Sequence, residues 1–371
     1  MAKIADRAIL ILNILAVIAL LMAYLAPVVN PSKIVLPALF GLGYPYLLMI
    51  HLAFLLYWLI RLKKEIFISL LVILLGWNHL NNLLPLQIRS SEIPVNASRD
   101  RFLKAMSYNV RGFNIYQWSK EAEAQQDIFR FIETQDPQLV CFQEYYTSSQ
   151  KGQTHNSISA QLGNLPYSAV YYTADQANRN GFGIATFSKY PILKKSRIPF
   201  NSSFNAAMYT DILFHSDTLR IFNIHLQSIR FQEDNYAFMD TARFKYNNEQ
   251  ISELRAIGNR LRTAFSMRAE QAQIIASYVE DSPYPVILMG DFNDTPQSYA
   301  YRKIKKGLDD AFRKSGSGFG NTYAGELPSF RIDFIMYGPP ILSDDFVRIK
   351  TDHSDHYPIS TFLFIPADSP E

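Results

Sequence analysis

Apolar residues are concentrated in the first 86 positions of this 371-residue chain. The run 8–26 contains one strongly polar residue, Asn13, and the run 34–60 is longer but is interrupted by two prolines and a histidine. Each run exceeds the roughly 18 apolar residues that indicate a membrane span. A signal peptide is the alternative for the first run, but no convincing small-residue cleavage site precedes Pro27, and a second apolar run follows at once. We therefore expect two helices that cross a bilayer.

A third apolar run, 66–84, has a polar C-terminal end. It is apolar as far as Trp77 and then carries three asparagines and a histidine, so it reaches spanning length only if this end lies near the membrane surface. We therefore predict an all-α anchor of two to three transmembrane helices over residues 1–86. The third helix decides the topology, because two spans return the chain to the side of its N-terminus and three leave it on the opposite side.

Cations flank the first two apolar runs at one end. Lys3 and Arg7 precede the first run, and Arg61, Lys63 and Lys64 follow the second. Because Lys and Arg near span ends are retained on the cytoplasmic side, the N-terminus is expected in the cytoplasm. The sequence thus predicts an integral membrane protein, in the cytoplasmic or inner membrane if bacterial, and three spans make its C-terminal domain extracytoplasmic.

A polar stretch, 87–101, is typical of a linker and precedes a domain of residues 102–367. About 265 residues are enough to bury one large core. Strand-like runs alternate with helical ones, which predicts an α/β or α+β sandwich. Strands are expected at 102–110, 138–142, 168–172, 183–188, 207–214, 219–226, 286–289, 333–337 and 360–365, and helices at 120–134, 156–162 and 267–280.

Composition narrows the function only slightly. The formal net charge of +3 is too small to identify a nucleic acid as partner. The single cysteine, Cys141, excludes an internal disulfide, and its apolar neighbours predict a packed side chain. A Ser or Cys hydrolase is rejected because no nucleophile elbow occurs in the sequence.

Polar side chains stand where several apolar, strand-like runs end. Asp291 and Asn293 follow the run 286–289, where an Asx-type turn is the structural alternative to a site. A basic carboxylate beside a neutral donor suits a different task, in which Asp291 orients or deprotonates a water molecule and Asn293 holds a phosphate oxygen. These two residues are therefore candidates for hydrolytic chemistry.

Asp355 and His356 precede the last predicted strand and form a pair suited to metal binding or to stabilising negative charge on phosphorus. Asp333 stands among apolar residues on another predicted strand, where a buried carboxylate requires a partner. We expect Asp333 to accept a hydrogen bond from His356 and to fix its tautomer. The alternative is a surface aspartate paired with Arg331.

Glu144 and Asn109 each close a strand-like run. Mg²⁺ prefers one or two carboxylates together with oxygen atoms from water and substrate. Glu144 can anchor such an ion, with Asn109 as a neutral ligand or phosphate contact. Mn²⁺ is the substitute ion. A helix cap or a loop contact is the alternative for each. Asn223 and His225 are two residues apart and face the same side of a strand, where His225 could donate to a phosphate oxygen or to a leaving group.

Taken together and in this order, these motifs resemble those of the endonuclease/exonuclease/phosphatase superfamily, whose Gly-x-Ala and Ser-x-x-Pro strand is also similar to residues 181–191. The resemblance covers about 103–365. It implies a four-layer α/β/β/α sandwich of two packed mixed sheets, with one active site across the sheet tips, and a metal-dependent phosphoester hydrolase. It further implies Glu144 as the principal Mg²⁺ ligand with Asn109 and Asp355 as neighbours, Asp291 and Asn293 as the water-activating pair, Asp333 and His356 as the orienting dyad, and His225 as a phosphate-facing histidine. From their positions on the predicted strands, Asn223 and Asn293 are further candidate phosphate contacts.

The substrate stays open at this point. The resemblance favours a nuclease-like phosphodiesterase on nucleic acid, whereas the anchor favours a phospholipid or sphingomyelin headgroup; the tryptophan-rich and Cys-Asp-Arg signatures of inositol phosphatases are absent. The segment 230–265 is either an extra amphipathic helix or a groove wall that meets phosphates. A non-catalytic membrane interaction module is the alternative of another class, and nothing in the sequence calls for an obligate protein partner.

Overall fold

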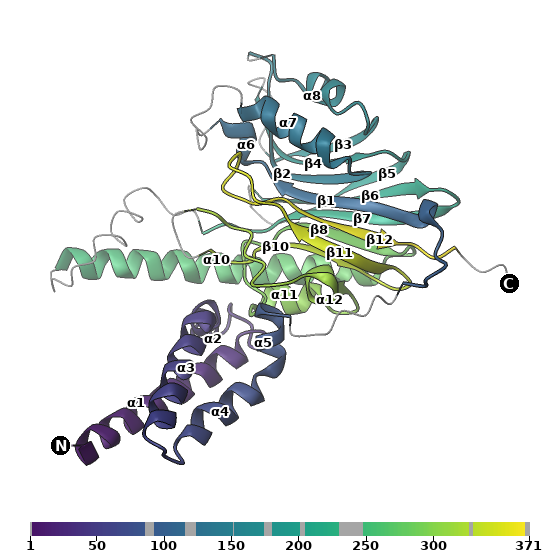
Figure 1. Ribbon diagram of the computed structural model, residues 1–371. Coiled ribbons are helices and arrows are strands. Elements are labelled where there is room, and N and C mark those ends of the chain that lie inside the picture. The colour runs from purple at the N-terminus through teal and green to yellow at the C-terminus, as the bar shows by residue number, and fades with distance from the viewer. Residues whose placement is uncertain are drawn as a thin grey trace.

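The computed structural model describes residues 2–85, 93–115, 124–150, 152–173, 180–200, 205–229, 248–325 and 329–367. Figure 1 shows a bundle of N-terminal helices below a sandwich of two β-sheets. The bundle consists of α1 (Ala2–Leu25), α2 (Leu36–Leu42), α3 (Tyr44–Ile60), α4 (Ile66–Leu75) and α5 (Trp77–Leu83).

Two of the three predicted spans are broken helices. The axis bends by 68° between α2 and α3 and by 72° between α4 and α5. The first break lies at Gly43, directly before a helix whose first turn contains Pro45. The second lies at Gly76, where a Cβ atom would meet the Tyr24 hydroxyl oxygen at 2.0 Å. Only α1 is by itself long and apolar enough to cross a membrane, and the number rises to three if each bent pair counts as one span.

A buried polar cluster joins three helices of the bundle. Asn13 of α1 donates from Nδ2 to the Ser69 hydroxyl of α4 at 2.8 Å and accepts from Trp58 Nε1 of α3 at 3.1 Å. His51 Nδ1 lies 3.0 Å from the same Ser69 oxygen. Because an apolar environment offers no other partners for these groups, their mutual bonds fix which faces of α1, α3 and α4 meet.

The sandwich contains two open sheets of six strands each (Figure 1). Strands β1 and β2 run parallel in the first sheet, as do β7 and β8 in the second, and the other pairs are antiparallel. The first sheet has the order β11 (Leu342–Arg348), β12 (Ile359–Phe364), β1 (Phe102–Asn109), β2 (Leu139–Ser148), β4 (Asn180–Ser188) and β3 (Tyr167–Tyr172). The second has the order β5 (Ile192–Ile198), β6 (Ala206–Phe214), β7 (Asp217–His225), β8 (Val286–Asp291), β10 (Asp333–Tyr337) and β9 (Asp309–Asp310).

Helices cover the outer face of each sheet. Apolar residues of α7 (Ala124–Gln135) and α8 (His155–Gln161) pack on the first sheet, and those of α10 (Asn248–Glu280) and α11 (Tyr299–Ile304) pack on the second. A third apolar cluster, which includes the buried Cys141, fills the space between the sheets. The predicted four-layer α/β/β/α sandwich is therefore confirmed. The remaining short helices are a 3₁₀ turn (Arg99–Arg101), α6 (Arg111–Asn114) and α12 (Ala311–Ser315).

Sequence patterns missed two strands of ordinary length, the two-residue strand β9, the short helices α6, α11 and α12, and part of a longer helix. β5 and β11 were not predicted, because both have a largely exposed burial pattern and so lack an apolar run. Helix α10 begins at Asn248, well before the predicted residue 267, so residues 248–265 of the segment 230–265 are helical. Residues 230–247 of that segment, residue 86 of the predicted anchor and residues 87–92 of the predicted linker lie outside the described residues.

The buried polar cluster yields a stability prediction. Asn13→Leu leaves the Trp58 N–H without its acceptor and removes one of the two side-chain contacts of the Ser69 hydroxyl, and we expect a loss of about 1–3 kcal/mol in stability. The measurement is the unfolding midpoint of the full chain in detergent. Ile14→Leu, at an exposed neighbouring position of α1, is the matched control, and equal midpoints for the two variants would contradict the role of the cluster.

Candidate active site

Three site residues lie in one row across the second sheet. His225 of β7 pairs with Asp291 of β8, and Asp291 pairs with Asp333 of β10. The preceding residue, Gly290, makes this row possible, because its φ is +150° and a Cβ atom there would meet the Ile224 carbonyl oxygen at 1.9 Å. The sheet register alone thus brings together residues that are more than a hundred positions apart in the chain.

The first sheet contributes Asn109 and Glu144. Asn109 ends β1, and Glu144 lies where the pairing of β2 with β4 shifts between Phe142 and Tyr145. This β-bulge gives Glu144 a φ of +51°, and bulges of this kind change the direction of a side chain within a strand. The Asn109 amide nitrogen lies 3.4 Å from Glu144 Oε1 and 3.0 Å from Asp291 Oδ2, so it connects the two sheets.

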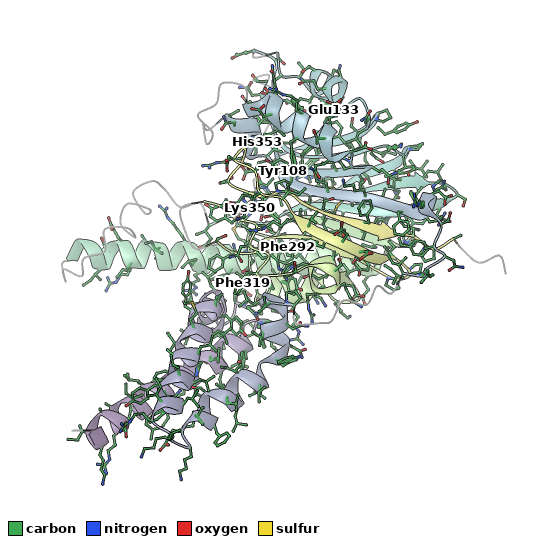
Figure 2. All side chains as sticks on the ribbon, in the orientation of Figure 1. Tyr108, Glu133, Phe292, Phe319, Lys350 and His353 are labelled. Atoms are coloured by element: carbon green, nitrogen blue, oxygen red, sulfur yellow. The ribbon has the colours of Figure 1, made fainter. Side chains whose placement is uncertain are left out.

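The loop between β11 and β12, in which Figure 2 labels Lys350 and His353, completes the site. Its Ser354 hydroxyl donates to the Asn109 carbonyl at 2.8 Å, and Asp355 pairs with Arg111 at 3.1 Å. His356 Nδ1 lies 2.9 Å from Asp333 Oδ2, which is the contact predicted from the sequence. The alternative pairing of Asp333 with Arg331 is wrong, because Arg331 binds the buried Asp310 instead, at 2.8 Å.

Asn293 turns back on Asp291. Its backbone N–H donates to Asp291 Oδ1 at 2.7 Å, and its amide donates to Asp291 Oδ2 at 3.2 Å and to the Leu226 carbonyl at 3.0 Å. The Asx-type turn and the site role are therefore compatible, since the turn itself orients the carboxylate. On the other side of Asp291, His225 Nε2 lies 3.6 Å from Asp291 Oδ2 and 3.9 Å from Glu144 Oε1.

The phosphate contact predicted for Asn223 does not fit the structure. Its side chain is fully buried between the sheets, where it accepts from Gln143 Nε2 at 2.9 Å and donates to the Ala185 carbonyl at 2.9 Å. The alternation of side chains along a strand correctly predicted that Asn223 and His225 lie on the same side of β7. Asn223, however, is two residues further from the end of the strand than His225. Asn223 and Gln143 form a polar support behind the site.

Burial and charge act together on the carboxylates. Burial raises the pKa of Asp291 to about 7, helped by the neighbouring Asp333 and opposed by His356 and by the Asn293 and Asn109 hydrogen bonds. Burial and then the charge of Asp355 raise the pKa of Glu144. Burial lowers the pKa of His356, but Asp333 and Asp291 outweigh it, so the net pKa is raised. Such shifts, grouped at the ends of strands, are typical of catalytic sites.

Comparison with known proteins identifies the family. Residues 106–356 match the Endonuclease/Exonuclease/phosphatase family. The chain belongs to this family. Its members are phosphoester hydrolases, and so is this chain. Residues 6–83 match a second family, described as a domain of unknown function (DUF8431), and no curated protein matches the chain.

Solved structures of endonuclease/exonuclease/phosphatase proteins share the fold. A family protein from Bacteroides vulgatus superposes with a TM-score of 0.52 at 17% identity, covering 71% of this chain and 98% of its own. One from Beutenbergia cavernae gives 0.51 at 14% identity, with 71% and 72% covered. A humanized TDP2 from D. rerio gives 0.50 at 16% identity, with 71% and 99% covered.

Two places in this endonuclease/exonuclease/phosphatase site have the donors that a divalent cation needs. Asp291, Asp333 and His356 offer three ligand atoms within 4.8 Å of one another, all buried. Two of these residues are already joined through His356 Nδ1. Glu144 is partly exposed, and its carboxylate is repelled by the like charge of Asp355. A bound cation would reduce this repulsion. The donor chemistry at Glu144 therefore fits a hard cation best.

Sequence inspection missed a pair of positioning residues on α10. Arg268 is buried, donates to the carbonyls of Asn293 at 2.6 Å and Gln227 at 3.1 Å, and pairs with Asp294 at 3.0 Å. The Gln271 side-chain oxygen accepts from the Gln227 backbone N–H at 2.9 Å. Their spacing of three residues on a predicted amphipathic helix, with both side chains on the buried face, was the available signal.

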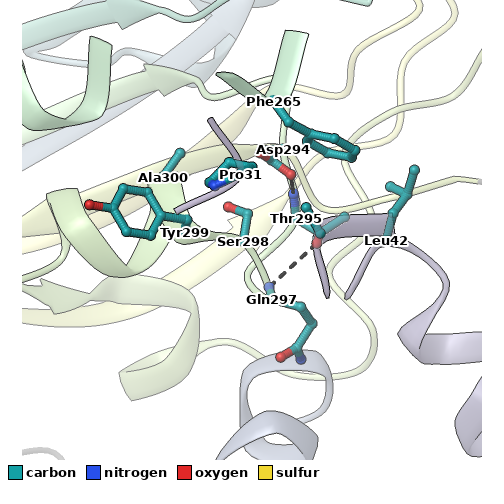
Figure 3. A pocket seen from close by; sticks show the side chains of 10 residues that line it. Pro31, Leu42, Phe265, Asp294, Thr295, Gln297, Ser298, Tyr299 and Ala300 are labelled. Carbon is teal, nitrogen blue, oxygen red and sulfur yellow. Dashed lines mark hydrogen bonds between the residues drawn. The ribbon is translucent and has the colours of Figure 1, made fainter. Parts of the chain in front are cut away.

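The helical bundle touches the loop that follows Asn293. Gln297 donates from Nε2 to the His79 carbonyl at 2.8 Å, and its Oε1 lies 2.6 Å from His79 Nδ1. Figure 3 shows the same junction, where Pro31 and Leu42 of the bundle face Thr295 and neighbouring loop residues across a small cavity. Gln297, which contacts the N-terminal helices, thus lies four positions after the site residue Asn293.

Arg268 provides a test of positioning. Arg268→Met leaves the Asp294 carboxylate buried and unpaired, and we expect a loss of about 3–5 kcal/mol in stability together with a fall in kcat that exceeds the change in KM. Arg220→Met is the matched control, because Arg220 forms an ion pair with Asp211 at the other end of β7. It should lower stability and leave kcat unchanged; equal kcat losses in both variants would show that the effect is only structural.

Proposed function

We propose that this chain is a membrane-anchored, Mg²⁺-dependent phosphodiesterase, with residues 1–86 as anchor and 102–367 as catalytic domain. One observation carries the catalytic part: the Asn109 amide lies within 3.4 Å of both Glu144 and Asp291, which come from different sheets. These two carboxylates, together with His225 and His356, form a set that can bind a phosphodiester and a cation at the same time. A nucleic acid is the first candidate substrate.

Asp291 is proposed as the general base. With a pKa of about 7 it takes up a proton readily near neutral pH, and the N–H groups of Asn293 and Asn109 hold it in place. Water loses a proton to Asp291 as its oxygen forms a bond to phosphorus. The bond from phosphorus to the leaving oxygen breaks in line with this attack, and His225 can supply that oxygen with a proton.

His356 is proposed to bind a non-bridging phosphate oxygen. Asp333 engages Nδ1, so Nε2 is the nitrogen available to face the substrate, and it lies 3.8 Å from Asp291 Oδ2. Asn293 is the second proposed phosphate contact. Glu144 and Asp355 would hold Mg²⁺ or Mn²⁺, with Asn109 as a neutral neighbour. When bound, the cation stabilises the negative charge that develops on the phosphate and leaving oxygens.

A phospholipid or sphingomyelin headgroup is the second candidate substrate. The observation that favours it is the contact of His79 with Gln297, because it keeps the loop after Asn293 against the helices proposed to lie in the membrane. Most of the exposed large apolar side chains among the described residues lie between Ile4 and Trp77, which supports a lipid environment for these helices.

The orientation in the membrane is part of the proposal. Arg61 pairs with Asp6 at 3.1 Å at one end of the bundle, and His79 contacts Gln297 at the other. The cations Lys3, Arg7, Lys63 and Lys64 belong to the first end, so the positive-inside rule favours a cytoplasmic N-terminus and an extracytoplasmic catalytic domain.

The catalytic assignment is tested by two conservative variants. Asp291→Asn removes the base, and we expect kcat on a generic phosphodiester to fall by about 10²–10⁴-fold. Glu144→Gln should raise the Mg²⁺ concentration for half-maximal activity by at least about tenfold. EDTA should abolish turnover and added Mg²⁺ should restore it.

Asp136→Asn and Glu133→Gln, both exposed near the end of α7, are the matched controls and should behave like the unaltered protein. Full turnover of Asp291→Asn would refute the assignment. Binding of ligand without hydrolysis by the unaltered protein would support the alternative of a non-catalytic membrane interaction module.

The topology can be tested with cysteine labelling, because the native Cys141 is buried and gives little background. Ser149→Cys lies in an exposed turn after β2 and should react with a membrane-impermeant maleimide on intact cells or spheroplasts. Lys63→Cys lies at the end of the bundle that is remote from the catalytic domain, and it should react only after permeabilisation. The reverse pattern would place the catalytic domain in the cytoplasm.

A further inference from the structure

A groove of about 440 Å³ lies where the N-terminal helices meet α11 and α12. One wall comes from the ends of α1 and α5, and the other from the catalytic domain. The site residues Asn109, Glu144 and Asp291 do not line it. Tyr24, Val28 and His79 line it from the bundle, and Arg302, Lys305 and Arg313 line it from the catalytic domain.

The catalytic-domain wall is strongly cationic. It carries two arginines and two lysines, and no carboxylate of the described residues lines the groove. The nearest acids on the same elements are engaged elsewhere: Asp310 binds Arg331 at 2.8 Å and the Tyr301 hydroxyl at 2.7 Å, and Asp309 pairs with Lys314 at 3.5 Å. The groove therefore attracts an anion.

One of these cations lacks a full set of partners, and a second is affected by burial and by like charge. The Nε atom of Arg313 is buried and has no hydrogen-bond partner in the described part of the chain. Burial, followed by the nearby charge of Arg313, lowers the pKa of Lys305. Lys306 pairs with Glu280 at 3.4 Å, and both side chains are 71% exposed, so this pair contributes little. An anion with several acceptor oxygens would satisfy these groups.

The bundle wall and its neighbourhood carry residue types that are common at a membrane surface. Val28 at the end of α1 is 57% exposed, and Trp77 at the start of α5 is half exposed. Tyr24 stacks on His79, with ring centroids 4.5 Å apart. Tryptophan and tyrosine collect at membrane surfaces, because their rings are apolar and their N–H and O–H groups are polar.

We propose that this groove binds the phosphate headgroup of an anionic membrane lipid, with Arg302, Lys305 and Arg313 as its ligands. The proposal rests on the proposed membrane anchor, since the acyl chains would lie along α1 and α5. The headgroup would contact both walls, and Pro296, which lines the groove, is three residues from Asn293. The lipid would then stabilise the junction between bundle and catalytic domain.

The test uses the full chain in mild detergent. Native mass spectrometry measures binding of phosphatidylglycerol and of phosphatidylcholine with the same acyl chains. The groove variant combines Arg302→Gln, Lys305→Gln and Arg313→Gln. The control variant combines Lys194→Gln, Lys195→Gln and Arg197→Gln, which removes the same charge from the exposed strand β5.

We expect the unaltered protein to prefer phosphatidylglycerol, and the groove variant to bind it about a hundredfold more weakly, while the control variant keeps its affinity. Equal losses in both variants would overturn the proposal, because they would indicate non-specific charge attraction. Displacement of the lipid by millimolar inorganic phosphate would show a free phosphate site instead. If the groove variant loses binding of single-stranded DNA but keeps its lipid binding, the groove is a nucleic-acid site, and this result would also overturn the proposal.

Hydrolysis of bis(p-nitrophenyl) phosphate is measured on the same preparations. All three proteins should hydrolyse it at equal rates if groove and active site are separate, which also shows that the variants are folded. If the groove variant, but not the control variant, loses hydrolysis and has a lowered thermal unfolding midpoint, its weaker lipid binding reflects a folding defect and the proposal is overturned. If the unaltered protein does not hydrolyse the substrate, the proposed activity fails while the lipid comparison still decides the role of the groove.

Discussion

The Asn109 amide connects two carboxylates that belong to different sheets, and the candidate site depends on this contact. An apolar layer holds the sheets together and fixes the distance between them. Apolar contacts do not determine which polar side chains of the two sheets meet. A buried carboxylate such as Asp291 would be costly without donors, and Asn109 and Asn293 supply them. The same bonds that make the buried charge tolerable therefore also set the direction of the carboxylate.

Much of the site could be predicted from sequence because strand ends are easily recognised. Apolar runs followed by Asp291, by Glu144 or by Asn109 predicted side chains at one rim, and the need of Asp333 for a partner predicted its bond to His356. These inferences needed only local pattern and the cost of burying charge. The order of the motifs then gave the family and, with it, the four-layer fold.

Other features depend on three-dimensional context that a single sequence does not carry. The bulge that turns Glu144 comes from a register shift against β4, and the burial of Asn223 depends on Gln143 across the sandwich. Arg268 acts on loops distant from it in sequence. The bends at Gly43 and Gly76 were missed because hydropathy records composition and not the direction of a helix axis.

The helices of the bundle differ greatly in length. α1 has 24 residues and α4 has 10, which correspond to about 36 Å and 15 Å along their axes. A bilayer around the proposed anchor would have to thin on the side of α4 or let the bundle lean. Because Gln297 is bonded to that bundle, membranes of different thickness would, under the proposed anchoring, present the catalytic rim at different heights above the lipid.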